Sequence, residues 1–233
     1  MANTVQQVRA ALEQDRDINL HEHPIEIRVD DAIRLVGEVG DIRAKRKAWR
    51  LARAATARDD VIDELSIVPG EPRGADELRQ AVLDTLKQEP VFAEVSVVDS
   101  REPPGNPVGR GWIGVDTEGA RVVLVGEIGG LSQRRLAEVL CWWVPGSADV
   151  DNRIHVDPPE PDTDTALSSA IAIVLERDPS VDGDQVGVTA RHAVVRLEGV
   201  VPTAEQARLA ELDCWYVPGV HDVDHQLIVQ SAP

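Results

Sequence analysis

A 35-residue segment of this chain occurs twice, and the repeat constrains the fold more than any local pattern does. Val122–Val156 and Val195–Val229 align without a gap at an offset of 73 residues, and 17 of the 35 positions are identical. The shared positions include a Cys-Trp pair, a Val-Pro-Gly run and an Asp-Val-Asp run. Self-similarity at a fixed spacing indicates that one supersecondary unit is used more than once.

A third and more divergent copy precedes these two. Leu35–Gly40 (LVGEVG) matches Leu124–Gly129 (LVGEIG) at an offset of 89 residues. The two offsets differ by 16 residues, which is about the length of a Pro- and Gly-rich insertion at 99–114 in the middle copy. We therefore expect three domains, at residues 1–70, 71–160 and 161–233.

Each copy shows the order helix, strand, strand, helix, strand. Apolar residues recur at helical spacing in the first and fourth segments and alternate in short runs elsewhere. In the third copy, Thr203 with Gln206 three residues later has the spacing of a capping box and marks the start of the second helix. The expected segments of the third copy are a helix that is capped by Asp164 or Thr165 and runs to about 177, strands 185–190 and 193–197, a helix ending near 216 and strand 223–229.

The other two copies are read in the same way. The middle copy predicts helix 76–88, strand 93–98, an irregular loop over 99–114, strand 121–125, helix 132–143 and strand 152–156. The first copy predicts helix 4–14 and strands 25–29 and 32–36, followed by a second, basic helix. The fold class is therefore α+β: three tandem αββαβ domains, each a small mixed three-stranded sheet with two helices.

The chain resembles the BON domain in all three copies. The motif is a strand ending in Leu-x-Gly, followed by a helix and a closing Val-x-Gly and strand. It is carried by Leu35-Val36-Gly37, Leu124-Val125-Gly126 and Leu197-Glu198-Gly199, and by the closing runs Val144–Val156 and Val217–Val229. The resemblance implies a non-enzymatic binding module of the kind associated with phospholipid surfaces and with envelope or osmotic stress. A relative that senses potassium implies a second function, ion sensing.

The overall charge limits the partners that this chain can bind. The formal net charge is −17 and the isoelectric point is about 4.7, which opposes binding to nucleic acid and to a bulk anionic membrane. No apolar leader or membrane-spanning run is found in the sequence, so the expected location is the cytoplasm. In a reducing compartment, Cys141 and Cys214 are expected to be small core residues and not a disulfide.

One segment has the opposite charge. Asp41–Arg58 carries seven basic residues and one acid, which leaves a formal charge of −23 for the rest of the chain. The pattern fits a solvated helix face, a basic helix lying on anionic lipid, or a basic head that binds the acidic body of another copy, including head-to-tail. The candidate binding residues here are Arg43, Lys45, Arg46, Lys47, Trp49, Arg50 and Arg53.

Aromatic pairs end the second helix of the later two copies. Trp142-Trp143 and Trp215-Tyr216 occupy equivalent positions, where BON helices usually have polar residues, and we expect their rings to point at least partly outward. They fit an interface between repeats or subunits, an exposed patch for a membrane or protein partner, or ordinary core packing.

No motif in the sequence indicates catalysis, a cofactor or a metal. His21-Glu22-His23 lacks an obvious third ligand, and no spacing supports a nucleophile with its base. The leading interpretation is a cytoplasmic, non-enzymatic binding or scaffold protein that docks on a phospholipid surface or associates with itself or another protein, with a role in stress. The alternative is a sensor for a small ligand or an ion such as potassium.

Overall fold

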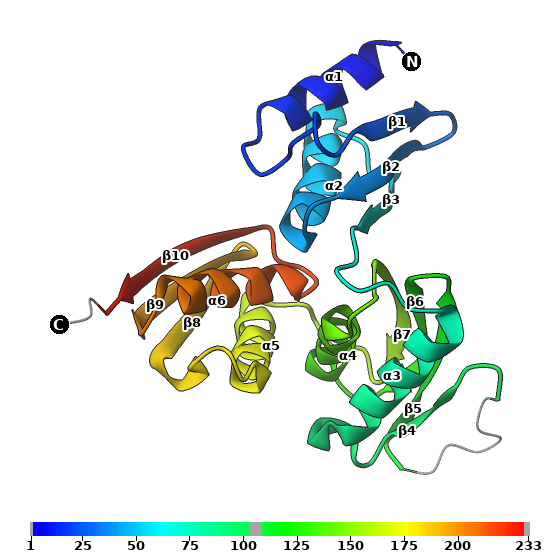
Figure 1. Cartoon of the computed structure of the whole chain (residues 1–233), viewed down its shortest axis with the longest axis vertical. Helices are drawn as coiled ribbons and strands as arrows, with labels where there is room; N and C mark the ends of the chain where they lie inside the picture. The colour runs from blue at the N-terminus through cyan, green and yellow to red at the C-terminus, as the bar shows by residue number, and fades with distance from the viewer. Residues whose placement is uncertain (1, 103–108, 231–233) are drawn as a thin grey trace. The chain divides into compact units, whose positions relative to one another are not determined.

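The computed structural model describes residues 2–102 and 109–230, and divides the chain into two compact units, Met1–Val68 and Pro69–Pro233 (Figure 1). The first unit has the expected αββαβ order. Its elements are α1 (Ala2–Glu13), β1 (Ile25–Val29), β2 (Ile33–Val39), α2 (Ile42–Thr56) and β3 (Val61–Ile67). The sheet order is β1-β2-β3, in which β1 and β2 are antiparallel and β2 and β3 are parallel.

Local chemistry sets the limits of α2. The Asp41 side chain accepts a hydrogen bond of 2.8 Å from the amide of Ala44, which satisfies a donor that the first turn leaves open. Ala57 ends the helix in the left-handed conformation. The helix connects two parallel strands, as a crossover connection must, and packs on the apolar side chains of Leu35 and Leu65.

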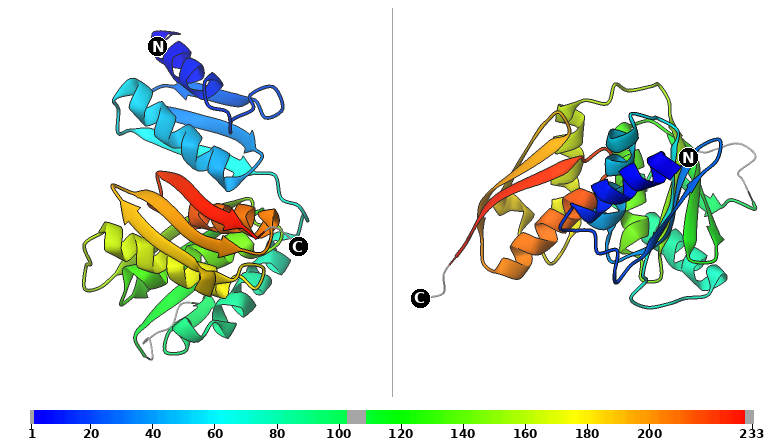
Figure 2. Two further views of the ribbon diagram at one scale, coloured as in Figure 1. Left: turned by 90° about the vertical axis from the view of Figure 1, so that its left-hand side faces the viewer. Right: turned by 90° about the horizontal axis from the view of Figure 1, so that it is seen from above.

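The second unit contains two more copies of this arrangement. The middle copy consists of α3 (Ala75–Gln88), η1 (Pro90–Phe92), β4 (Ser96–Asp99), β5 (Gly111–Glu118), β6 (Arg121–Ile128), α4 (Leu131–Trp143) and β7 (Asp149–Val156). The last copy consists of α5 (Asp164–Arg177), η2 (Gly183–Gln185), β8 (Val186–Arg191), β9 (Val194–Val201), α6 (Ala204–Tyr216) and β10 (Asp222–Val229). Helices α5 and α6 cover one face of the sheet β10-β9-β8 (Figure 2). The α+β fold class is confirmed.

The middle sheet has four strands, so the expectation of three strands in every copy is wrong there. Its order is β4-β5-β6-β7. The strand that matches β1 and β8 is β5, which begins inside the segment 99–114 expected to be a loop and continues beyond it, whereas β4 is an additional edge strand parallel to β5. Glycines suggested a loop, but a Cβ on Gly111 would lie 2.3 Å from the carbonyl oxygen of Glu127. This glycine therefore allows two strands to approach closely. The Pro-rich residues 103–108 lie outside the described residues.

The glycine of the Leu-x-Gly motif has one structural role in all three copies. Gly37, Gly126 and Gly199 have φ of +144°, +134° and +141°. A Cβ on Gly199 would lie 2.0 Å from the carbonyl oxygen of Gln185, on the segment that enters the neighbouring strand. The sequence indicated a positive φ or a close helix, and the structure shows a positive φ with a close strand.

Candidate functional site

The two lysines of the basic helix α2 are buried and form ion pairs within the first unit. Lys45 is 3% exposed, and its ammonium lies 3.0 Å from Asp63 and donates to the carbonyl oxygen of Leu65. Lys47 is also buried and is paired with Asp17. Burial alone would raise the pKa of the Asp17 carboxyl, but the hydrogen bond from Lys47 and the nearby cations outweigh it, so the pKa is lowered.

The arginines of α2 are half-buried, and Arg43 and Arg53 pair with carboxylates of the same unit. Arg43 lies 3.6 Å from Asp17 and 3.4 Å from Asp41. Arg53 pairs with Asp59, and its guanidinium also lies 4.6 Å from the centre of the Trp49 ring.

The remaining candidates on this helix have fixed or half-buried side chains. The Trp49 indole donates a hydrogen bond of 2.9 Å to the carbonyl oxygen of Val61. Arg46 and Arg50 are half-buried. Much of the positive charge of α2 therefore faces acids of its own unit, a feature that a count of charges along the sequence does not reveal.

The aromatic ends of α4 and α6 meet at the junction between the second and third copies. Trp142 and Trp215 are 5% and 1% exposed, so the expectation that they point outward is wrong for these two rings. The rings of Trp142 and Tyr216 lie 6.2 Å apart at an angle of 36°. Trp143 and Tyr216 are half-buried. The physical reason is that α4 contacts β6 and β7 as well as α5 and α6, so little of its surface remains free.

Ion pairs add polar contacts to this junction. Arg135 of α4 is 2% exposed and donates to the carbonyl oxygen of Pro218 at 3.0 Å and to Asp162 at 2.7 Å. Arg177 of α5 donates to Glu89 at 3.1 Å. These three bonds connect residues of the second copy with residues at or beyond the linker, so they hold the two copies in one unit.

A buried carboxyl lies at the same junction. Asp213 of α6 is 3% exposed, and burial, followed by the nearby Asp178, raises its pKa to about 8, although a hydrogen bond with Trp143 works in the opposite direction. Asp213 Oδ2 has no hydrogen-bond partner among the described residues. The carboxyl is therefore mostly neutral at pH 7.

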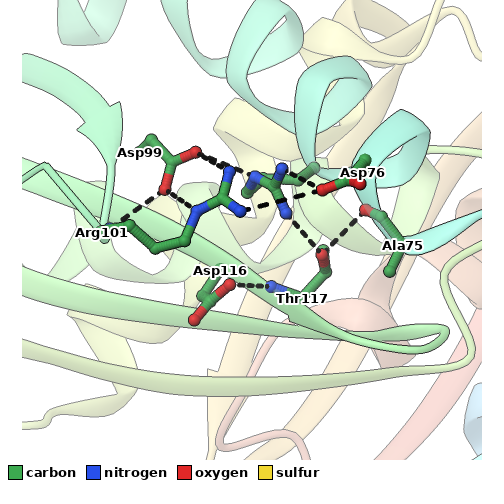
Figure 3. A network of polar contacts seen from close by, with 7 residues as sticks. Ala75, Asp76, Asp99, Arg101, Asp116 and Thr117 are labelled. Carbon is green, nitrogen blue, oxygen red and sulfur yellow. Dashed lines mark hydrogen bonds and ion pairs between the residues drawn. The ribbon is translucent and has the colours of Figure 1, made fainter.

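A second polar network fastens the additional strand β4 to α3 (Figure 3). Arg79 lies 3.0 Å from Asp99 and also pairs with Asp76, while Arg101 lies 2.6 Å from Asp99. The Thr117 hydroxyl donates to the carbonyl oxygen of Ala75 at 2.8 Å. The hydrogen bond from Arg101 and the adjacent charges keep the pKa of Asp99 well below its usual range. Every charge in this network has a partner, so its role is structural.

The comparison with known families agrees with this architecture. The sequence model of the BON domain matches residues 2–69, 108–158 and 163–231. The chain belongs to the BON family. No curated protein matches it.

Two solved structures resemble the BON chain weakly. Both are of CdsD, a structural protein of the type III secretion system of Chlamydia trachomatis; one is its C-terminal domain. The identities are 14% and 15%, the alignments cover 99% of this chain and 99% and 93% of the CdsD chains, and the TM-scores are 0.26 and 0.27. Scores this low carry no argument about fold or function.

The described BON repeats contain no obvious chemical centre. Both cysteines are buried and free, and burial raises the pKa of each thiol well above its usual range. Among residues 2–102 and 109–230, no three His, Cys, Asp or Glu side chains are arranged to hold a metal ion. No helix in the same ranges is long and apolar enough to cross a membrane.

Sequence reasoning missed the buried polar residues of the BON junction, although the repeat contained a signal for one of them. Asp213 occupies the position that Leu140 has in the second copy. A carboxylate at a position that is apolar in the other copy indicates a special environment. Arg135 gave no such signal, because the equivalent Arg208 is also an arginine and pairs with Glu205 on the surface.

Proposed function

We propose that this BON protein is a non-catalytic assembly protein that acts by self-association. The observation that carries the proposal is a group of aliphatic side chains left exposed on the sheet of the third copy. These side chains include Val200 and Ile228, which are register partners on the face that the helices leave open, and Val194, which lies on the same face at the other end of β9. Val229 is also exposed, but it points to the opposite face of the sheet. Apolar side chains on an open face favour an interface, because contact removes them from water.

The environment of α2 favours this function over docking on an anionic membrane. A basic residue near an anionic leaflet contributes about 1 kcal/mol of attraction, but only when its charge can reach the lipid. Lys45 and Lys47 are buried against carboxylates, and the protein as a whole carries a charge of −17. Attraction through this helix is therefore weak and easily screened.

The salt dependence of assembly tests the proposal. We expect association of the full-length chain, measured by light scattering after size exclusion, to persist or increase between about 50 mM and about 500 mM salt. Salt screens the repulsion between acidic copies and leaves apolar contact intact. A monomer at both salt concentrations would contradict the proposal, and association lost at high salt would indicate a basic-to-acidic contact through α2. Vesicles of zwitterionic and anionic phospholipid, mixed with the same samples, should not retain the protein.

A small cavity supports ion sensing as a second candidate function. The cavity has a volume of about 180 Å³ at the start of α2, and its polar lining includes Asp17, Asn19, Glu22, His23 and Asp41. A cation that binds only the folded state raises the unfolding temperature as its concentration rises. Equal unfolding temperatures in potassium and sodium chloride of the same ionic strength would rule out selective sensing of potassium by this chain.

A further inference from the structure

The third copy differs from the other two at one cross-strand pair. Val200 of β9 and Ile228 of β10 are register partners and are 45% and 65% exposed. The equivalent pairs are Glu127 with His155 in the second copy and Glu38 with Ser66 in the first. This cross-strand pair of the shared fold is therefore polar in the first two copies and aliphatic in the third.

The aliphatic pair lies beside a sheet edge. Strand β10 is the end strand of the order β10-β9-β8, and among residues 2–102 and 109–230 it forms a strand pair with β9 alone. The amide of Gln230 donates to the carbonyl oxygen of Val201 at 2.8 Å, so the backbone groups of Gln230 face β9. Successive residues of a strand point their backbone groups to opposite sides, so those of Leu227 and Val229 point to the open edge.

The sequence of this edge is suited to pairing with itself. Residues 226–230 read Gln-Leu-Ile-Val-Gln, which is nearly the same in both directions and contains no charge. In an antiparallel pair centred on Ile228, Leu227 of one copy lies opposite Val229 of the other. Each residue then meets a chemically similar partner, as a twofold interface requires, and no carboxylates are brought face to face at its centre.

We propose that two copies of this chain pair through β10, antiparallel and around a twofold axis at Ile228. The outward backbone groups of Leu227 and Val229 then form hydrogen bonds across the axis. The two Ile228 side chains meet at a non-hydrogen-bonded position, where opposing side chains approach most closely, and each lies beside a Val200. The sheets of the two third copies become one sheet of six strands. This inference rests on the proposed function of self-association and identifies its interface.

Two substitutions separate the apolar contact from the backbone pairing. Ile228→Lys places a charge in the centre of the interface and should weaken dimerisation by about a hundredfold. Val229→Pro removes one outward amide donor and leaves the bonds to β9 intact, because proline is tolerated where the amide faces solvent. The matched controls are His155→Lys and Val156→Pro, at the equivalent positions of the second copy. Both controls should dimerise like the wild type.

Sedimentation velocity of the full-length chain over micromolar concentrations at high salt measures these effects. Loss of the dimer in both β10 variants, but in neither control, would support the interface. A wild-type dimer that survives both β10 substitutions would overturn it while leaving self-association intact. Loss in Ile228→Lys alone would overturn strand pairing. A wild-type monomer would overturn both the interface and the proposed function, and vesicle binding lost in Ile228→Lys would then assign the patch to lipid.

A symmetric disulfide provides a positive test. At a non-hydrogen-bonded antiparallel pair the Cα atoms lie about 4.5 Å apart, within the range that a disulfide spans. Ile228→Cys should therefore form a covalent dimer under mild oxidation, while His155→Cys should not. The native Cys141 and Cys214 are buried and do not compete. Equal crosslinking of the two variants would overturn the proposed axis.

Discussion

We predict that Asp213 makes the stability of the unit formed by the second and third copies depend on pH. Its carboxyl is buried beside Asp178, and burial raises its pKa to about 8. In the unfolded chain the same group has an ordinary pKa of about 3.9. The folded state therefore binds the proton more tightly, and the stability that this proton contributes is lost as the pH rises towards 8.

The size of the effect follows from the two pKa values. Between pH 5 and pH 7 the carboxyl is neutral in the folded chain and ionised in the unfolded chain, so the free energy of unfolding falls by about 1.4 kcal/mol per pH unit. From pH 5 to pH 8 the loss is about 3–4 kcal/mol. Carboxyls whose pKa is lowered in the folded state, such as Asp164, are already ionised in this window, and the buried Cys214 thiol stays protonated.

Asp213→Asn should remove most of this slope, because an amide of similar shape does not ionise. The assay is urea unfolding at pH 5, 6, 7 and 8 at constant ionic strength, followed by tryptophan fluorescence. Four of the five tryptophans lie in the unit Pro69–Pro233, so the signal reports mainly on the unit that contains Asp213. Glu205→Gln is the control on the same helix, since Glu205 has a lowered pKa and should leave the slope unchanged.

Two results would refute this reasoning. The first is an equal slope in the wild type and in Asp213→Asn, which would mean that the carboxyl is ionised in the folded state at every pH tested. The second is a wild-type stability that rises from pH 5 to pH 8.

Three further substitutions test individual contacts. Lys45→Met should lower the free energy of unfolding of the first unit by about 3 kcal/mol, because it leaves Asp63 without its buried partner. The double variant with Lys45→Met and Asp63→Asn should recover part of this loss in the same urea assay. Gly199→Ala should lower the free energy of unfolding by about 3 kcal/mol or more, since its Cβ would clash with the carbonyl oxygen of Gln185. Gly129→Ala, where a Cβ meets nothing, should lower it by less than about 0.5 kcal/mol, and thermal unfolding measures both. Arg135→Leu should lower the free energy of unfolding by about 2–3 kcal/mol and speed amide hydrogen exchange at the junction. Arg208→Leu, at the equivalent exposed position, should change neither the free energy of unfolding nor the exchange rate measurably.

The sequence predicted most of the fold because the signals were local and occurred more than once. The helix expected to run to about 177 is α5, although Thr163 caps it and not Asp164 or Thr165. Thr203 caps α6 through the amide of Gln206, as its spacing indicated. Strand β5 was missed because Gly111 and Gly114 resemble loop residues. In the structure they provide close contact within the sheet, with the Trp112 ring lying over Gly114.

The candidate site was harder to predict because it depends on which elements face each other. A helical pattern shows that Lys45 and Lys47 lie on α2, but not that Asp63 and Asp17 reach them from other segments. Likewise, Trp142 at a helix end resembles an exposed ring until α6 packs beside it. Tertiary partners of charged and aromatic residues are not encoded in periodicity.

Differences between the copies carry information that a single copy does not. Each copy needs its motif glycine and its apolar stripe in order to fold, so these features say nothing about what one copy does. A residue that departs from its counterparts at an equivalent position is not explained by the shared fold. Asp213, which replaces Leu140 of the second copy, is such a residue and is buried. Ile228, which replaces His155, is another and is exposed to solvent. Both occur in the third copy, so we assign to that copy both the pH-sensitive contact with its neighbour and the edge that pairs with a second chain.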